Sequence, residues 1–290
     1  MAIVPAMKRS LPPLFAIAPF MFCCGISVQD ARAVLVVADF NDIASGAVNG
    51  KAGGTGFTGS WSGSSGGSVS TTNLTSTLYN VPQSGTGQRL RGQNSTGLRQ
   101  NFRTLATTPT NEVWFSFLAQ VETGGGQAGL SFNSPTGTPF DNPGTVYAYF
   151  QDTSLLLSFG AGTAATVTDA NVIGSTTLVV GRFVINGGGL ADTVSLWVNP
   201  DLIANSDINT YTPVYSSNSV DALDSITHIG AVVARNDAAT SGGGGIDNIR
   251  ISDGGGDAMQ AYLDVTNIPE PSVAGLLATL GIASTLRRRR

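Results

Sequence analysis

Carboxylates are the first residues in this sequence that could do chemistry, because two of them facing across a cleft can hydrolyse a glycosidic bond. The chain contains three glutamates, at Glu112, Glu122 and Glu270. None of them belongs to a Glu-x-Asp-x-x-Glu arrangement, which would place two carboxylates on one face of a strand. The pairs Asp39 with Asp42 and Asp221 with Asp224 border expected turns, where aspartate caps the backbone. We therefore expect a protein that is not an enzyme.

Calcium is the metal that these side chains would suit best, since it takes oxygen ligands from Asp, Asn and the main chain. The candidate ligands are Asp247 and Asn248, together with Asp39 or Asp42. Their spacing does not resemble a calcium loop, so unligated aspartates on an acidic surface remain the alternative. No other cofactor is expected. The single histidine, His228, cannot build a zinc site alone and is expected to be a hydrogen-bonded strand residue.

Aromatic side chains give the strongest signal for ligand binding. Tyr147 and Tyr149 alternate on one face of an expected strand, and Trp114 and Trp197 oppose the aliphatic face of theirs. Rings exposed on a sheet can stack on sugars, which predicts carbohydrate binding. The alternative is that these rings are buried between two sheets as core.

Strands are the elements that must position these residues. Short runs rich in Val, Ile, Phe, Tyr and Thr alternate with clusters of Gly, Asn, Asp and Pro, which is typical of an all-β protein. The expected strands are 34–40, 111–120, 129–133, 145–151, 154–159, 176–185, 193–198, 225–234 and 246–251. Segment 46–70, rich in Gly and Ser, is interpreted as ordered loops and short edge strands, with disorder as the alternative. One helical turn is expected at 199–205.

The central expected strand is 111–120. Its alternation predicts that Val113, Phe115 and Phe117 point to one side and Trp114 to the other. Three segments, 113–118, 192–200 and 245–251, resemble strands of the concanavalin A-like, laminin-G-like jelly rolls. This resemblance implies a two-sheet jelly-roll sandwich over residues 34–267. That family usually has an acidic residue where Asn248 stands.

Charge and cysteine content limit the partners of this body. Seven of the 15 basic and two of the 19 acidic residues lie outside 34–267, which leaves 8 against 17 and a formal charge of −9. Such a surface repels nucleic acid, so no nucleic-acid partner is expected. Both cysteines, Cys23 and Cys24, precede residue 34, so the body contains no disulfide.

The last 23 residues, 268–290, have three parts. Pro269, Glu270 and Pro271 form a triplet that holds the backbone extended, and the run 272–286 carries no charge. Arg287, Arg288, Arg289 and Arg290 end the chain. An apolar run that ends in cations is typical of a stop-transfer helix held in the membrane, although its length alone would also suit a packed terminal helix.

This tail resembles the PEP-CTERM sorting domain of exported bacterial proteins. The resemblance implies that an exosortase recognises Pro269, Glu270 and Pro271 and cleaves nearby. The four terminal arginines would then fix the cytoplasmic end of a transmembrane helix until the tail is removed.

The first 33 residues are typical of a signal peptide. Lys8 and Arg9 precede a mostly apolar run, and Ala31 and Ala33 supply the small residues that a signal peptidase requires. We expect cleavage after Ala33. Both ends of the chain therefore predict export through an anchored inner-membrane intermediate, followed by release to the cell surface or the extracellular matrix.

Three functions follow, in order of preference. The first is an exported, non-catalytic structural or adhesive protein sorted by an exosortase. The second is a lectin-like module that binds exopolysaccharide. The third is a glycan hydrolase.

Overall fold

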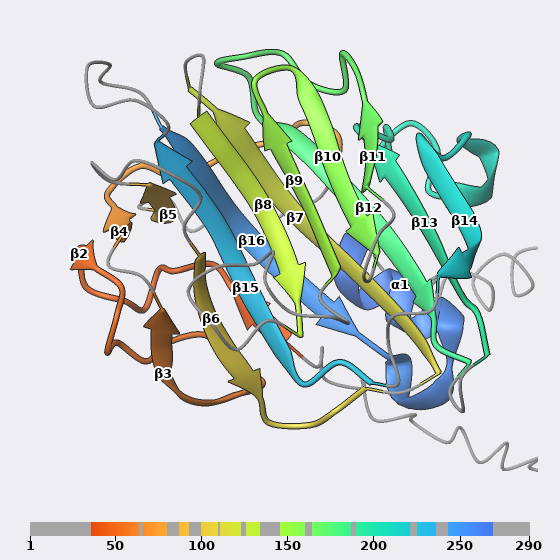
Figure 1. Ribbon diagram of the computed structural model, residues 1–290, viewed down its shortest axis with the longest axis horizontal. Coiled ribbons are helices and arrows are strands. Elements are labelled where there is room, and N and C mark those ends of the chain that lie inside the picture. Colours follow the sequence, from red (N-terminus) through yellow and green to blue (C-terminus); the bar gives the residue numbers. More distant parts are fainter. Residues whose placement is uncertain are drawn as a thin grey trace, which may run out of the picture. The chain divides into compact units, whose positions relative to one another are not determined.

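Two antiparallel β-sheets packed face to face form the body of the protein (Figure 1). The computed structural model describes residues 36–63, 66–79, 87–92, 100–109, 111–122, 126–133, 146–159, 164–186, 190–220, 225–235 and 243–268. Every strand pairing within them is antiparallel. The predicted all-β two-sheet sandwich is thereby confirmed. The narrower assignment to the concanavalin A type stays a prediction.

The larger sheet has nine strands in the order β14-β13-β12-β7-β16-β5-β4-β2, with β1 also paired to β16. Its strands are β1 (Val36–Ala38), β2 (Gly46–Ala47), β4 (Gly67–Ser70), β5 (Arg89–Gly92), β7 (Glu112–Val121), β12 (Thr177–Val184), β13 (Asp192–Val198), β14 (Tyr215–Val220) and β16 (Gly244–Ser252). The ten-residue strand β7 lies between β12 and β16 and spans the sheet.

The smaller sheet has seven strands in the order β11-β10-β9-β8-β15-β6-β3. They are β3 (Phe57–Gly63), β6 (Gln100–Leu105), β8 (Gly126–Phe132), β9 (Val146–Gln151), β10 (Ser154–Phe159), β11 (Ala164–Val167) and β15 (His228–Arg235). Gly129 on β8 illustrates the close packing of this sheet, because a Cβ there would lie 2.2 Å from the carbonyl oxygen of Ala148.

The main core lies between the two sheets. Val113, Phe115 and Phe117 of β7 point into it, and the Phe115 ring packs 5.0 Å from that of Phe132 and 5.2 Å from that of Phe183. The alternation predicted for residues 111–120 is confirmed, because Trp114 belongs to a different cluster on the opposite face of the strand.

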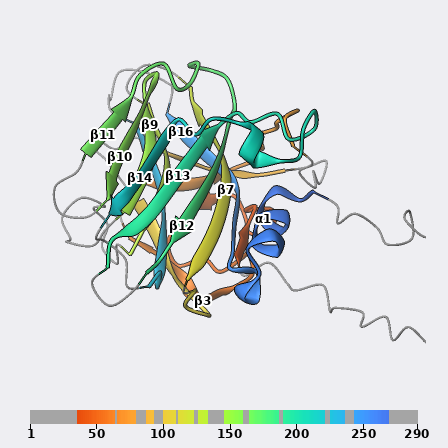
Figure 2. The same ribbon diagram turned by 90° about the vertical axis from the view of Figure 1, so that its right-hand side faces the viewer.

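That second cluster lies between the outer face of the larger sheet and helix α1 (Ala258–Thr266). Figure 2 shows α1 on the side of β7 and β12 that faces away from β9, β10 and β11. Asp257 caps the helix by accepting hydrogen bonds from the amides of Met259 (3.0 Å) and Gln260 (3.1 Å). Val265 packs inward, so α1 covers Trp114 from outside.

The bounds predicted from the sequence for most long strands agree with the structure within a few residues, but several elements were not predicted. Strands β5, β6, β11 and β14 and helix α1 were not expected. The predicted helical turn at 199–205 is present as one hydrogen bond from the amide of Asn205 to the carbonyl of Asp201 (3.0 Å). It is followed by a short 3₁₀ helix, η1 (Ile208–Thr210). The described parts of the Gly- and Ser-rich segment form β2, β3, β4 and loops, with Trp61 fully buried.

The predicted targeting residues lie outside the described part of the chain. They are Ala31, Ala33, Pro269, Glu270, Pro271, Arg287, Arg288, Arg289 and Arg290. Within the described residues, no helix has both the length and the hydropathy needed to cross a membrane. The predicted transmembrane run 272–286 is not among those residues.

Candidate functional site

An ion pair stands at the start of β7 on the outer face of the larger sheet. Arg182 of β12 donates from Nε to Glu112 Oε1 (2.9 Å) and from Nη2 to Glu112 Oε2 (2.7 Å). The indole Nε1 of Trp114 also donates to Glu112 Oε1 (2.8 Å). Both carboxylate oxygens are therefore engaged, which fixes the carboxylate as an acceptor and leaves it poorly placed to transfer a proton to a substrate.

Aromatic rings form the floor next to this pair. The Trp114 ring stacks on Trp197 with centroids 5.8 Å apart and planes 13° apart, and it contacts Tyr262 of α1 at 5.0 Å. The guanidinium of Arg182 lies 5.7 Å above the Trp114 ring. Tyr262 donates its hydroxyl to the carbonyl of Ser206 (2.5 Å), and burial raises its pKa. The floor is therefore rigid and largely apolar.

Buried hydrogen bonds fix α1 against the sheet and so fix the wall of the site. Ser116 of β7 donates to the carbonyl of Val265 (2.6 Å), and Ser252 of β16 donates to Asp264 Oδ2 (2.6 Å). Arg250 Nη1 also donates to the Asp264 carbonyl (3.3 Å). Hydrogen bonds to buried polar groups are costly to lose, so the helix is held in one position.

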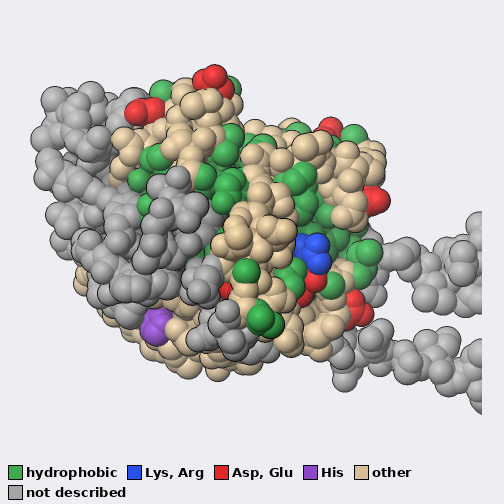
Figure 3. All heavy atoms as spheres, turned by 45° about the vertical axis from the view of Figure 1, so that its right-hand side comes forward, with side chains coloured by type: hydrophobic (Ala, Val, Ile, Leu, Met, Phe, Trp, Pro, Cys, Tyr) green, Lys and Arg blue, Asp and Glu red, His purple; other side chains and the backbone are tan. Residues whose placement is uncertain are grey.

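These elements enclose a groove of about 670 Å³, hereafter the Trp114 groove. It is lined by Glu112, Trp114, Arg182, Ser206, Asp207, Ile208, Asn209, Ala258, Met259, Tyr262, Leu263 and Ile268. Most of its surface is apolar, with one carboxylate–guanidinium pair and the polar side chains of Asp207 and Asn209 at its edge. Figure 3 shows a basic group with acidic groups next to it, set among hydrophobic side chains. A concave apolar surface with a few convergent polar groups is the usual form of a small-molecule site.

The four predicted sugar-binding aromatics form two separate pairs on different sheets and not one site. Trp114 lines the Trp114 groove, and Trp197 stacks against it without lining the groove. The two residues are 6% and 7% exposed, so they serve mainly as core of the outer cluster. Tyr147 and Tyr149 lie on the smaller sheet, on the face of β9 opposite to its core residues, with ring centroids 5.5 Å apart. Burial raises the pKa of Tyr149 to about 12. Of the four rings, Trp114 alone is among the described residues that line the groove.

The predicted calcium ligands Asp247 and Asn248 lie at an irregularity in β16, where Asn248 adopts a positive φ of 49°. Asp247 is buried, and its carboxylate accepts hydrogen bonds from the amides of Leu74 (2.9 Å) and Asn248 (2.7 Å). Burial raises the pKa of Asp247 to about 8, although these two donors lower it. A carboxyl that is protonated at neutral pH is a poor calcium ligand.

The other two calcium candidates are engaged in turns. Asp39 accepts from the amide of Asn41 (3.2 Å), and Asp42 accepts from the amide of Gly54 (2.7 Å). Across the described ranges, no group of three or more His, Cys, Asp or Glu side chains is arranged to hold a metal ion. The geometry of these ranges therefore gives the calcium hypothesis no support.

His228 lies on β15, as expected for a strand histidine. Its Nδ1 is 2.9 Å from the hydroxyl of Thr227, and its ring lies 6.3 Å from that of Phe102. Burial lowers the pKa of His228, so the ring is mainly neutral at pH 7. The hydrogen-bonded structural role predicted for it is confirmed.

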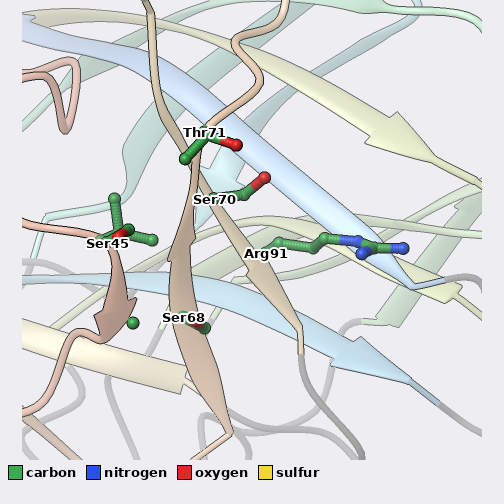
Figure 4. A pocket seen from close by; sticks show the side chains of 7 residues that line it. Ser45, Ser68, Ser70, Thr71 and Arg91 are labelled. Atoms are coloured by element: carbon green, nitrogen blue, oxygen red, sulfur yellow. The ribbon is translucent and has the colours of Figure 1, made fainter.

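A second, polar pocket of about 340 Å³ lies at β2, β4 and β5, hereafter the hydroxyl pocket. It is lined by Ser45, Gly46, Ser68, Val69, Ser70, Thr71 and Arg91. Figure 4 shows Ser70, Thr71 and Arg91 on the neighbouring strands, with Ser45 across from them. Four hydroxyls and one guanidinium make this pocket the chemical opposite of the Trp114 groove.

Apart from Trp114, the residues that combine to form the two pockets were not predicted from the sequence as binding residues. Glu112 was considered only as a catalytic carboxylate, and Arg182 and Arg91 were not considered as binding groups. One signal for the groove was available: Asp257 followed by Ala258, Ala261, Tyr262 and Val265 is a capped amphipathic helix. Which strands lie next to each other is not encoded locally, so the pairing of Glu112 with Arg182 could not have been found from spacing.

Comparisons with known proteins complete the description. Neither a protein-family model nor a curated protein sequence matches the chain. Among solved structures, it is similar to a β-glucanase of Bacillus licheniformis, with a TM-score of 0.39 and 10% identity over 72% of this chain and 98% of that one. It is also similar to carbohydrate binding module CBM66 from Bacillus subtilis, with a TM-score of 0.34 and 13% identity over 57% of this chain and 86% of that one.

A further similar structure is the carbohydrate recognition domain of Emp46p in its metal-free form, with a TM-score of 0.38 and 9% identity over 57% of this chain and 82% of that one. The two-sheet architecture of the present protein rests on its own strand pairings.

Proposed function

We propose that the body of this protein is a non-catalytic carbohydrate-binding module and that the Trp114 groove is its glycan site. The observation that carries the proposal is the combination in one groove of an apolar aromatic floor with a fixed carboxylate–guanidinium pair. A sugar ring has an apolar C–H face and a rim of hydroxyls, so it needs both kinds of surface in one place.

A binding role is supported over a hydrolytic one by the environment of Glu112. Glycoside hydrolysis requires two carboxyl groups across the scissile bond, one of which donates a proton. Both oxygens of Glu112 already accept hydrogen bonds from Arg182 and the Trp114 indole, so they are not free to approach a scissile bond. Asp207, the other carboxylate of the groove, caps η1 by accepting from the amide of Asn209 (3.0 Å).

The proposal is tested with a matched pair of surface substitutions in the purified full chain. Met259→Arg places a cation in the mouth of the groove, whereas Val172→Arg changes an equally exposed apolar residue outside it (63% and 68% exposed). The probes are neutral oligosaccharides of β-glucan, xylan and galactan, and the readout is calorimetric affinity.

At least one of these probes should bind the wild type. Met259→Arg should weaken that binding by roughly tenfold or more, and Val172→Arg should change it less than about twofold. Equal losses in both variants, or no binding of any probe by the wild type, would contradict the proposal.

We further propose that the body is exported and sorted through Pro269, Glu270 and Pro271 by an exosortase. The observation that favours this is the position of α1. Its C-cap, Asn267, is in the left-handed conformation, and Ile268, the last described residue, directly precedes the triplet in the sequence. A recognition motif directly after a folded domain would be accessible to a membrane enzyme.

The sorting proposal predicts a processed protein at the cell surface of the native host. Intact mass should show that the wild type lacks residues 1–33 and the tail, while Glu270→Ala retains the tail in the membrane fraction. If both proteins keep residues 272–290, the tail is a simple anchor and no exosortase acts on it.

A further inference from the structure

The hydroxyl pocket is a second site on the same sheet face, distinct from the Trp114 groove. We propose that it binds an acidic sugar, with Arg91 holding the carboxylate or sulfate and the hydroxyls of Ser45, Ser68, Ser70 and Thr71 meeting the ring hydroxyls. This inference goes beyond the proposed function, because it assigns a second site with a different ligand charge, and it does not require the groove to bind.

Strand register places the side chains of the pocket on one face. In the antiparallel pair of β4 and β5, Ser68 lies opposite Arg91 and Ser70 opposite Arg89, while Leu90 belongs to the core on the other face. Directly opposed residues share a face and lie close enough for their side chains to act on one ligand. The alternation therefore gathers two serines and two arginines outside the sandwich.

The hydroxyls of this pocket are available to a ligand. Among the described residues, the structure gives the side-chain hydroxyls of Ser45, Ser68 and Thr71 no hydrogen-bond partner, and that of Ser70 meets only its near neighbour Thr72 (3.1 Å). Each hydroxyl can both donate and accept, as sugar hydroxyls do. A pocket of about 340 Å³ is at the small end of ligand sites, which suits a single sugar unit.

The charge around the pocket is positive in an otherwise acidic body. Glu122 accepts from Arg89 Nη2 and from Arg91 Nε (3.1 Å) and Nη2, so one carboxylate faces two guanidinium groups. The ammonium of Lys51 donates to the carbonyls of Ala44 and Ser45 (3.0 Å) at the pocket edge. Of the eight basic residues between 34 and 267, Arg91 thus lines this pocket, and Arg89 and Lys51 bond to residues next to it.

Exposure decides which of the two guanidinium groups a ligand can reach. The side chain of Arg91 is 36% exposed, against 10% for Arg89, so Arg91 is the guanidinium that a ligand reaches. A guanidinium fork matches the two oxygens of a carboxylate or sulfate.

The test introduces a negative charge next to the arginines and leaves Arg89, Arg91 and Glu122 themselves unchanged. Ser70→Asp puts a carboxylate in the pocket. The matched control is Ser217→Asp on β14 of the same sheet, where the serine is also half-buried and also bonds the residue two positions on (3.3 Å). The probes are an oligogalacturonate, the same oligomer with its carboxyl groups reduced, a sulfated oligosaccharide and inorganic sulfate, each titrated into the purified full chain by calorimetry.

The inference predicts that the oligogalacturonate, the sulfated oligosaccharide or both bind and that the reduced oligomer does not compete. Ser70→Asp should weaken binding by about tenfold or more, whereas Ser217→Asp should change it less than about twofold. Equal affinity for the charged and reduced oligomers, equal effects of the two substitutions, or binding of inorganic sulfate alone would overturn it. Met259→Arg should leave the binding of the acidic oligosaccharide unchanged. Failure of the hydroxyl-pocket proposal can therefore be distinguished from failure of the groove proposal.

Discussion

A glutamate is paired with arginine at each end of β7, but the number of arginines differs between the two ends. Glu112 at its start meets one arginine, Arg182, whereas Glu122 directly after its end meets two, Arg89 and Arg91. Ten residues separate the glutamates, which is about 33 Å along an extended strand. One pair is balanced and the other group carries a surplus positive charge, although both lie on the outer face of one sheet.

The difference indicates how one sheet can present two kinds of surface. At Glu112 the charges cancel, Asp207 adds a negative charge, and an aromatic floor supplies the binding area, which suits neutral ligands. At Glu122 the carboxylate neutralises one guanidinium of two, and hydroxyls take the place of aromatic rings, which suits anions. Polarity and charge therefore change together along β7.

Removing each glutamate charge should produce very different losses of stability. Glu122→Gln removes a carboxylate that two guanidinium groups share, one of them only 10% exposed, and should lower the free energy of unfolding by about 3 kcal/mol. Glu112→Gln affects a pair that is 38% and 22% exposed and should cost about 1 kcal/mol or less. Urea unfolding at pH 7 measures both values. Similar losses in the two variants would show that the ends of β7 do not differ as described.

Asp247 lies between the two ends, opposite Leu118 of β7, and should make stability depend on pH. Its folded pKa of about 8 is above the unfolded value of about 4. Between these values the folded state keeps a proton that the unfolded state has released. The contribution of this group to stability should therefore be greatest near pH 4 and fall as pH rises to about 8, by at most ~1.4 kcal/mol per pH unit.

Asp247→Asn should remove this contribution, because the amide stays neutral. The measurement is urea unfolding of wild type and variant at pH 5, 6.5 and 8. The gap between the two should change with pH in favour of the variant at pH 8. Parallel curves would mean that Asp247 ionises in the folded state at an ordinary pKa.

The smallest predicted effect concerns the wall of the Trp114 groove. Asp257→Ala removes the N-cap of α1 and should lower the free energy of unfolding by about 1 kcal/mol. Since α1 forms one wall of the groove and no part of the hydroxyl pocket, the variant should weaken neutral-glycan binding and leave acidic-glycan binding unchanged. Equal weakening at both sites would indicate that the sheet, rather than the helix, was disturbed.

The sequence predicted the layers of the fold better than its site. The alternation of Val113, Trp114 and Phe115 is a local property, so it predicted which side of β7 faces the core. Strand β4 lies in the segment expected to form loops and short edge strands, and β5 was not expected, because both are four residues long and rich in Gly, Ser or Arg. Their role depends on pairing with β16 and β2, which are distant in sequence.

The aromatic residues show the same limit of prediction from the sequence. The periodicity correctly set Trp114 and Trp197 apart from the aliphatic face of their strands, but it left open whether the two rings are exposed binding residues or buried core. The covering element, α1, begins 60 residues after the end of β13, and its packing on the Trp114 ring cannot be deduced from the strands themselves. Burial of an outward-facing ring depends on what covers the sheet, which is a tertiary property.

The most direct test of the glycan-binding proposal uses the indole N–H groups of Trp61, Trp114 and Trp197 as reporters. The indole of Trp114 bonds Glu112 in the groove, whereas Trp61 is fully buried in the inter-sheet core. Neutral oligosaccharides titrated into the ¹⁵N-labelled full chain should shift the Trp114 indole signal in step with saturation and leave that of Trp61 in place. Saturation without movement of the Trp114 signal, or no saturation by any of the oligosaccharides, would contradict the assignment of the groove as the glycan site.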